Sequence, residues 1–221
     1  QCSIPGNEAS VVYTQVVARG ANTLLVTNDG KVVVCGNNEK KQCNIPDKEK
    51  GINYMQVAAG NRHVVLLRSD GSAVACGDND EGQCTIPPLG AIFGNAQVFT
   101  GLFGTALLRR DGSILICGDN SFGRCKVPEG LRNFRVKGIA GGDSHMVLLG
   151  TDGTAIQWGQ DLPDHWMLPP PDAGMAYAQV AAGDSHAVLL RVDGTVLAFG
   201  ENGFGQCNVP ELEDGDEIKN V

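Results

Sequence analysis

The sequence predicts an all-β protein, a β-propeller of 41-residue, four-stranded blades, and three observations lead to this prediction. An Asp-Gly pair recurs five times at a spacing of 41 residues, beginning at Asp29-Gly30. Series of glycine, proline and aliphatic residues follow the same step without an insertion, beginning at Gly36, Pro5 and Val16. The segments between these markers are short, apolar and rich in β-branched residues. Repeats of this length that contain several short strands are typical of propeller blades.

The four strands of a blade can be placed in the second repeat. They are residues 54–60, 63–68, 72–76 and 83–86. Asp70-Gly71 separates the second and third strands and is suited to the positive φ angles of a tight hairpin turn. A polar loop over residues 77–82 follows, and Pro87, which has no N–H donor, ends the fourth strand. One hairpin per repeat favours radial blades over the alternative, a solenoid of strands.

The repeats predict a single propeller domain over residues 1–221. Its five full repeats cover about 13–53, 54–94, 95–135, 136–176 and 177–217, with a partial blade at each end. The chain begins on a fourth strand, residues 1–5, and ends on the start of a first strand, residues 217–221. We therefore expect a fragment of a six- or seven-bladed ring, with a closed five-bladed ring as the alternative.

The composition restricts the classes of partner. Hydrophobic residues make up 42% of the chain, which is enough for a core, and 30 glycines indicate many turns. The formal net charge of -8 disfavours binding to nucleic acid and to anionic membranes, because both need basic surface. No apolar run is long enough to span a bilayer. We therefore expect a protein partner, without nucleic acid and without direct membrane insertion.

Two repeats carry a more specific resemblance. They read QVAAGNRHVVLLRSDGSAVACGDNDEGQCTIP over 56–87 and QVAAGDSHAVLLRVDGTVLAFGENGFGQCNVP over 179–210. This pattern resembles the repeats of the regulator-of-chromosome-condensation family, and the QC-I/V-P ending is most similar to its short-blade, inhibitor-type branch. The resemblance implies a β-propeller, commonly of seven blades, and a binding role. It does not imply one function, because members include an exchange factor on chromatin, a photoreceptor, ubiquitin-ligase modules and a β-lactamase inhibitor.

Six cysteines form three pairs with the same spacing of eight residues. These pairs are Cys35/Cys43, Cys76/Cys84 and Cys117/Cys125. Neighbouring strands could bring each pair into a disulfide, which would require an oxidising compartment; nothing else in the sequence indicates a location. The alternative is a small apolar contact between thiols, because Trp158 and Trp166 take the same positions in the fourth repeat. A zinc or thioredoxin-type site is disfavoured, since the chain has no CxxC motif.

Other chemistry is also disfavoured. The acidic loop DNDEG suggests calcium, but the equivalent loops do not keep its carboxylates, so turn formation by Asx side chains is the better interpretation. His63, His145 and His186 share one repeat position, and we expect them to bond the backbone of a neighbouring blade. No nucleophile or carboxylate recurs beside them. We therefore predict no enzyme activity, no cofactor and no metal.

Binding residues are expected where the repeat is broken or where loop tips carry aromatic side chains. The candidates for partner binding are Phe103, Phe122, Trp166, Met167, Pro170 and Phe204. The predicted function is a non-enzymatic protein–protein interaction propeller, an accessory or scaffolding subunit of a larger assembly. The alternative is a regulator or inhibitor that caps another protein's active site. A guanine-nucleotide exchange factor is less favoured because the chain is acidic, and a carbohydrate-binding propeller because aromatics do not recur in each blade.

Overall fold

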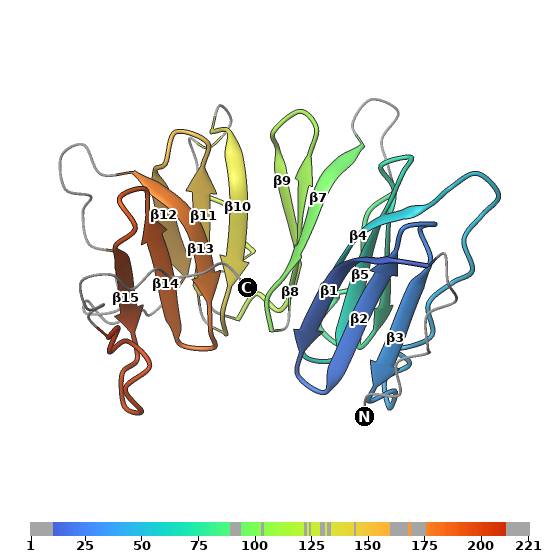
Figure 1. Cartoon of the computed structure of the whole chain (residues 1–221), viewed down its shortest axis with the longest axis horizontal. Helices are drawn as coiled ribbons and strands as arrows, with labels where there is room; N and C mark the ends of the chain where they lie inside the picture. The colour runs from blue at the N-terminus through green and yellow to red at the C-terminus, as the bar shows by residue number, and fades with distance from the viewer. Residues whose placement is uncertain are drawn as a thin grey trace.

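In the computed structural model, the described residues contain fifteen antiparallel strands in five three-stranded sheets (Figure 1). The structure describes residues 11–88, 94–102, 104–121, 123, 125–128, 131, 134–143, 145–159, 168 and 176–210. Sheets 1 to 3 contain β1 (Tyr13–Arg19), β2 (Asn22–Thr27), β3 (Val32–Gly36); β4 (Tyr54–Ala59), β5 (His63–Arg68), β6 (Ala73–Gly77); and β7 (Asn95–Thr100), β8 (Gly104–Arg109), β9 (Ile114–Gly118). Sheets 4 and 5 contain β10 (Val136–Gly141), β11 (His145–Gly150), β12 (Ala155–Gly159); and β13 (Tyr177–Ala182), β14 (His186–Arg191), β15 (Val196–Gly200).

Each sheet is a meander in which the second strand lies in the middle. The predicted Asp-Gly turn joins the second strand to the third: Gly71 has a φ of 83°, and Asp70 Oδ1 accepts the N–H and the hydroxyl of Ser72 at 2.8 and 2.7 Å. The same pair of bonds recurs at Asp111, Asp152 and Asp193. A glycine is needed after the aspartate because L side chains rarely adopt this backbone conformation. The hairpin prediction is therefore confirmed.

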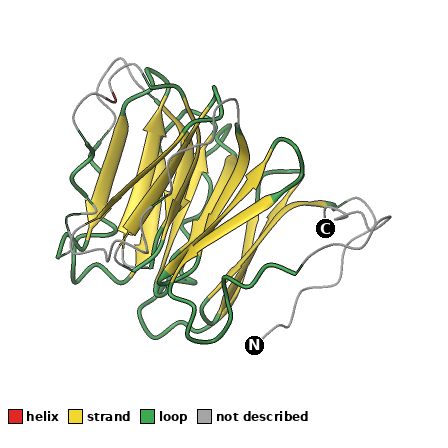
Figure 2. Ribbon diagram, turned by 90° about the vertical axis from the view of Figure 1, so that its left-hand side faces the viewer, coloured by secondary structure: helices red, strands yellow, loops and turns green. Residues whose placement is uncertain are grey.

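The five sheets follow one another around an arc, with each sheet facing the next (Figures 1 and 2). The first strand of each sheet packs against the first strand of the next, and the middle strands β2, β5, β8 and β11 contact β4, β7, β10 and β13. Sheets 1 and 5 lie at opposite ends of the arc. This arrangement confirms an all-β propeller architecture, and the number of blades in a complete ring stays a prediction.

The hydrophobic core lies between the sheets. Leu24 and Val26 of sheet 1 pack with Tyr54, Val57 and Leu66 of sheet 2, and similar clusters fill the next contacts. Burial on both faces explains why the middle strands read as continuous apolar runs. The outer face of sheet 1 is uncovered: Val16 is 68% exposed, whereas Val57 at the same repeat position is 1% exposed.

The predicted fourth strand is wrong for the second repeat, and among the described residues each blade has three strands. Gln83 and Cys84 lie in a turn, and Thr85 and Ile86 follow without regular structure. The N–H groups of Thr85 and Ile86 bond the carbonyls of Gly82 and Cys84 at 2.9 Å. The Cys84 N–H bonds a loop side chain. These local bonds take the donors that a strand ladder would need, and Ile86 packs against the core between sheets 2 and 3.

The other three predicted strands of this repeat are confirmed, with the third shifted by one residue to Ala73–Gly77. First strands begin at Tyr13, Tyr54, Asn95, Val136 and Tyr177, which keeps the 41-residue step. The assignment of residues 1–221 to one domain stays a prediction, because both ends of the chain lie outside the described residues.

Candidate functional site

A hydrogen-bonded loop follows the third strand in the first, second and fifth repeats, which all keep a Gln-Cys pair at this position. In the second repeat, Asn79 Oδ1 accepts the N–H of Cys84 at 2.8 Å, and Gln83 Oε1 accepts the N–H of Glu81 at 3.0 Å. The Cys84 thiol donates to the carbonyl of Asp78 at 3.1 Å. The carboxylate of Asp78 accepts the N–H of Asp80 at 3.2 Å. The polar residues of this loop therefore stabilise its own backbone, as the Asx-turn interpretation predicts.

The same bonds recur in the first and fifth repeats. Asn38 and Asn202 accept the N–H groups of Cys43 and Cys207 at 2.8 and 2.9 Å. The glutamine before each cysteine bonds the N–H two residues earlier. The glutamines of the first two repeats, Gln42 and Gln83, are almost completely buried. These loops are therefore ordered before any partner binds, which lowers the entropic cost of binding.

The three predicted disulfides are not formed. Cys35, Cys43, Cys76, Cys84, Cys117, Cys125 and Cys207 are free thiols. Each loop cysteine directs its thiol to a backbone carbonyl six residues earlier, at 3.1–3.4 Å. Burial, with the neighbouring Cys76 and Cys117 thiols, raises the pKa of Cys84 to about 12. The thiol form is strongly favoured there, so Cys84 acts as a small, half-buried donor, and the free thiols give no indication of an oxidising compartment.

His63 connects two sheets through a buried hydroxyl. Its Nε2 lies 3.1 Å from Thr105 Oγ1 on sheet 3, and this hydroxyl donates to the carbonyl of Gln83 at 2.7 Å. His63 and Thr105 are 1% and 0% exposed. Burial lowers the pKa of His63 to about 4, so the ring is neutral at pH 7. The expected bond to a neighbouring blade is present, through a side chain, and no substrate could reach this pair.

His145 occupies the same repeat position but lacks this connection. Ala187 stands where the hydroxyl of Thr105 would be expected, and neither ring nitrogen of His145 has a hydrogen-bond partner in the described part of the chain. Burial, with His186 nearby, lowers the pKa of His145 to about 4. An unpaired buried imidazole weakens the fold locally, and nothing in this geometry activates it for catalysis.

Phe204 is the candidate binding residue that the structure places on the surface. Its side chain is 95% exposed, at the tip of the fifth-repeat loop held by Asn202 and Gln206. The other five candidates lie outside the described residues. They are Phe103, Phe122, Trp166, Met167 and Pro170.

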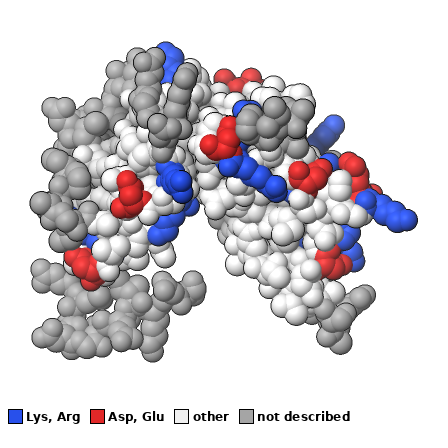
Figure 3. Space-filling model, turned by 90° about the horizontal axis from the view of Figure 1, so that it is seen from above, with Lys and Arg blue, Asp and Glu red and all other residues white. Residues whose placement is uncertain are grey.

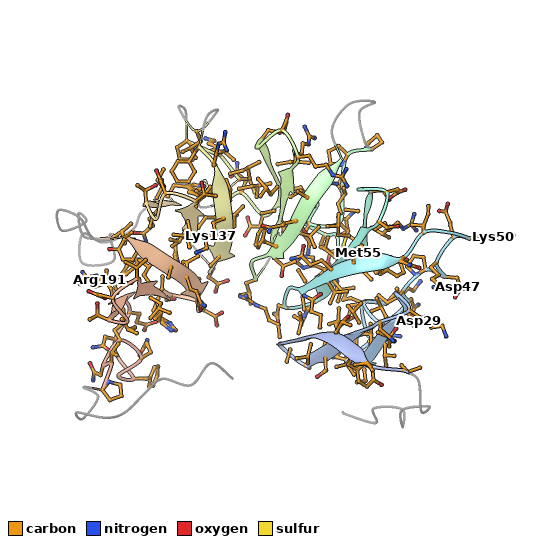
Figure 4. The ribbon with its side chains drawn as sticks, turned by 45° about the horizontal axis from the view of Figure 1, so that its top comes forward. Asp29, Asp47, Lys50, Met55, Lys137 and Arg191 are labelled. Carbon is orange, nitrogen blue, oxygen red and sulfur yellow. The ribbon has the colours of Figure 1, made fainter. Side chains whose placement is uncertain are left out.

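Five exposed apolar side chains of the described residues were not among the predicted binding residues: Val12, Val16, Met55, Val192 and Val209. Val192 is 65% exposed in the turn after β14, where the other repeats have polar residues, and this contrast could have revealed it. Met55 is 62% exposed on β4 (Figure 4), at a position that varies among the repeats and gives no such signal.

A groove of about 480 Å³ lies between sheets 1 and 2. Thr14, Asn28, Asn53 and Met55 are among the residues that line it. Its polar groups are largely engaged within the protein: the amide of Asn53 accepts from a lysine, and Thr14 donates to the carbonyl of Val26. The groove therefore offers a surface but no evident set of polar groups for a small ligand.

On the face shown in Figure 3, the basic and acidic side chains of the described residues are interspersed and do not form one patch. Lys40 pairs with Asp78 and Asp80 of the next repeat at 3.3 and 2.7 Å, and Arg68 pairs with Glu49 at 3.1 Å. The described part of the chain contains no helix of the length and apolarity needed to cross a bilayer.

Comparison with known proteins agrees with this architecture. Residues 56–83 and 177–206 match the sequence model of the Regulator of chromosome condensation (RCC1) repeat, which confirms the resemblance to that family. No curated protein sequence matches the chain significantly.

Solved propellers are similar in fold. Yeast RCC1 (Prp20), in a structure bound to Kap60, superposes with a TM-score of 0.70 at 19% identity over 87% of this chain and 57% of its own. Human WBSCR16 superposes with a TM-score of 0.73 at 20% identity, over 92% of this chain and 65% of its own. The ectodomain of the receptor kinase CR4 from Physcomitrella patens superposes with a TM-score of 0.71 at 18% identity, over 93% of this chain and 56% of its own. The chain thus spans less than two thirds of each of these structures, and identities this low establish the fold alone.

Proposed function

We propose that this chain is a non-enzymatic interaction module of the RCC1-like propeller type, which binds another protein or protein complex as an accessory or scaffolding subunit. One observation carries the proposal: a large apolar side chain, Phe204, stands almost fully exposed on a loop whose backbone is already ordered. Exposing a phenylalanine to water is unfavourable, and aromatic side chains on ordered loops are typical anchors of protein interfaces.

The order of the loop determines how this anchor would act. Asn202 and Gln206 bond the backbone on both sides of Phe204, and Asn202 also donates to Asn208 Oδ1 at 2.8 Å. Binding then costs little conformational entropy in the loop, and the burial of the ring contributes directly to affinity. The structures of related fold include yeast RCC1 bound to Kap60 and a report on the binding of Prp20p to Gsp1p and histones, which supports a protein as the class of partner.

The test is affinity capture from native extract with three forms of the chain. The wild type is expected to retain a partner at a fixed stoichiometry, and Phe204→Ser is expected to weaken that retention about 30-fold or more, the loss typical of an interface anchor. Val192→Ser is the matched control, because it removes an exposed apolar side chain at the opposite end of β15. Retention that is equal for the wild type and Phe204→Ser would refute the role of this loop.

The same samples distinguish the alternatives. A regulator or inhibitor that caps an active site would bind transiently and lower the activity of its target, whereas a scaffolding subunit would copurify in fixed proportion. The less favoured exchange-factor function predicts faster nucleotide release from a small GTPase. Release that is unchanged on addition of the chain would eliminate it.

A further inference from the structure

Polar bonds connect the first strand of a sheet to the preceding sheet. The N–H of the first residue donates to the carbonyl of the preceding turn glycine in three cases: Tyr54 to Gly30 at 3.1 Å, Asn95 to Gly71 at 2.9 Å, and Tyr177 to Gly153 at 2.8 Å. These bonds join sheets 1 and 2, 2 and 3, and 4 and 5. The equivalent residues between sheets 3 and 4 are Val136 and Gly112, which are both described and share no such bond. We call the contact between sheets 3 and 4 the central seam.

A second kind of bond follows the same distribution. The amide of Gln15 on β1 accepts from and donates to the backbone of Val57, at 3.1 and 3.0 Å, and Gln56 on β4 holds Val98 in the same way at 2.9 and 3.1 Å. Between sheets 4 and 5, the ammonium of Lys137 donates to the carbonyl of Ala178 at 2.8 Å (Figure 4 labels Lys137).

The central seam keeps the glutamine at this position, but the glutamine does not bond the backbone of the next sheet. Gln97 occupies the position of Gln15 and Gln56, yet its Oε1 is buried and has no hydrogen-bond partner among the residues that the structure describes. A buried amide oxygen without a donor is unfavourable, so this contact is weaker than its counterparts in the first two junctions.

Residue size explains the missing turn bond. The residue directly before a first strand packs closely on the turn glycine of the preceding sheet when its side chain is short. The closeness is shown by a Cβ atom placed on each glycine: on Gly30 it would lie 2.5 Å from Cβ of Asn53, and on Gly153 it would lie 2.4 Å from Cβ of Ala176. At the central seam this residue is Arg135, and a Cβ on Gly112 would meet nothing within 4 Å. We infer that the bulk of Arg135 keeps the chain away from the turn.

Apolar contacts hold the central seam. Ala106 packs with Ile139, Met146, Leu148 and Trp158, and Phe99 and Phe134 lie against this cluster. Apolar packing is not directional, so two faces joined in this way can slide or tilt at a smaller cost than faces joined by fixed hydrogen bonds.

We propose that the central seam is the hinge of the arc. Sheets 1–3 form one arm and sheets 4 and 5 form the other, and a tilt at the seam changes the separation of their outer ends (Figure 1). The loop that carries Phe204 lies on the second arm. The hinge does not depend on the proposed binding function, because the bonds that define it lie within the chain.

Amide hydrogen exchange, resolved by residue in NMR spectra of the full chain, tests the first part of this proposal. The N–H of Val136 is expected to exchange at least about tenfold faster than the equivalent N–H groups of Tyr54, Asn95 and Tyr177. Arg135→Asn should bring the exchange of Val136 into the range of these three. Conversely, Asn53→Arg should accelerate the exchange of the Tyr54 N–H. Equal protection of all four amides in the wild type would overturn the proposal.

Distance distributions from paired spin labels test the motion itself. Asn28, Arg110 and Val192 are exposed and occupy one repeat position, so labels introduced as noncanonical amino acids form two matched pairs. Each pair is two sheets apart, and only the pair 110/192 spans the central seam. The hinge is supported if the distance distribution of the pair 110/192 is broader than that of the pair 28/110, and if Arg135→Asn narrows the distribution of the pair 110/192. Equal widths contradict it.

Discussion

The hydroxyl of Thr105 is the most informative single group in the contact between sheets 2 and 3. It receives the Nε2–H of His63 and donates to the carbonyl of Gln83, and the threonine is completely buried. Thr105→Val keeps the shape of the side chain and removes this hydroxyl. The ring nitrogen of His63 then loses its partner, and the carbonyl of Gln83 keeps only the long contact from Cys117 Sγ at 3.8 Å. At about 1–3 kcal/mol for each group, we expect a loss of about 3 kcal/mol in the free energy of unfolding.

The matched variant is Thr105→Ser, which keeps the hydroxyl and removes a methyl group, at about 1 kcal/mol. The assay is urea unfolding at pH 7, followed by circular dichroism. With a denaturant dependence of about 3 kcal/mol per M, the midpoint should fall by about 1 M for valine and about 0.3 M for serine. A midpoint for Thr105→Val at or above that of Thr105→Ser would refute the reasoning, because the hydroxyl would then contribute nothing beyond its volume.

Three further predictions follow from the geometry of the site. His63 and His145 have pKa values of about 4 in the fold, against about 6.5 unfolded, so the unfolded chain binds more protons between these values. The free energy of unfolding should therefore fall as the pH falls from about 6.5 to about 4, by up to about 3 kcal/mol per histidine. Urea titrations at several pH values measure this slope, and the double variant His63→Leu, His145→Leu should remove it. An unchanged slope in the double variant would contradict the lowered pKa values. Asn79→Ala should lower the free energy of unfolding by about 1 kcal/mol because the Cys84 N–H loses its acceptor, whereas Asn79→Asp, which keeps the oxygen, should not; equal losses would count against the loop geometry. Folded protein at pH 8 should alkylate at Cys84 at least about a hundredfold more slowly than denatured protein, as followed by mass spectrometry, and rapid modification would exclude the raised pKa.

The repeat made most of the fold predictable. Asp-Gly pairs at a fixed step located five hairpins, because only a few residues tolerate the turn that they form. Apolar runs located the middle strands, because each sheet is buried between two others. The register followed from the absence of insertions.

The fourth strand was predicted wrongly for a physical reason. The segment QCTI has the composition of a strand, but Asn79 and a local turn take its donors. Composition reports a preference for extended backbone and does not reveal which side chain competes for a particular N–H. The sequence left disulfides and free thiols open as alternatives, and the structure has free thiols, since a spacing of eight residues cannot show that a thiol is directed at a backbone carbonyl.

The candidate site was predictable in part. Phe204 could be selected because an aromatic residue at a polar loop tip departs from the composition of the loop. Val192 was overlooked although its position is polar in the other repeats. The central seam could not be foreseen from the glutamine series, because Gln97 is present and only the structure shows that it forms no bond.

A crystal structure of residues 1–221 would show whether the 41-residue units fold as separate sheets around a common axis and present rigid loops. We expect five three-stranded sheets in an arc, with the first strands innermost and the backbone around Phe204 held by Asn202 and Gln206. Sheets stacked along a line, or strands exchanged between the units, would contradict this expectation.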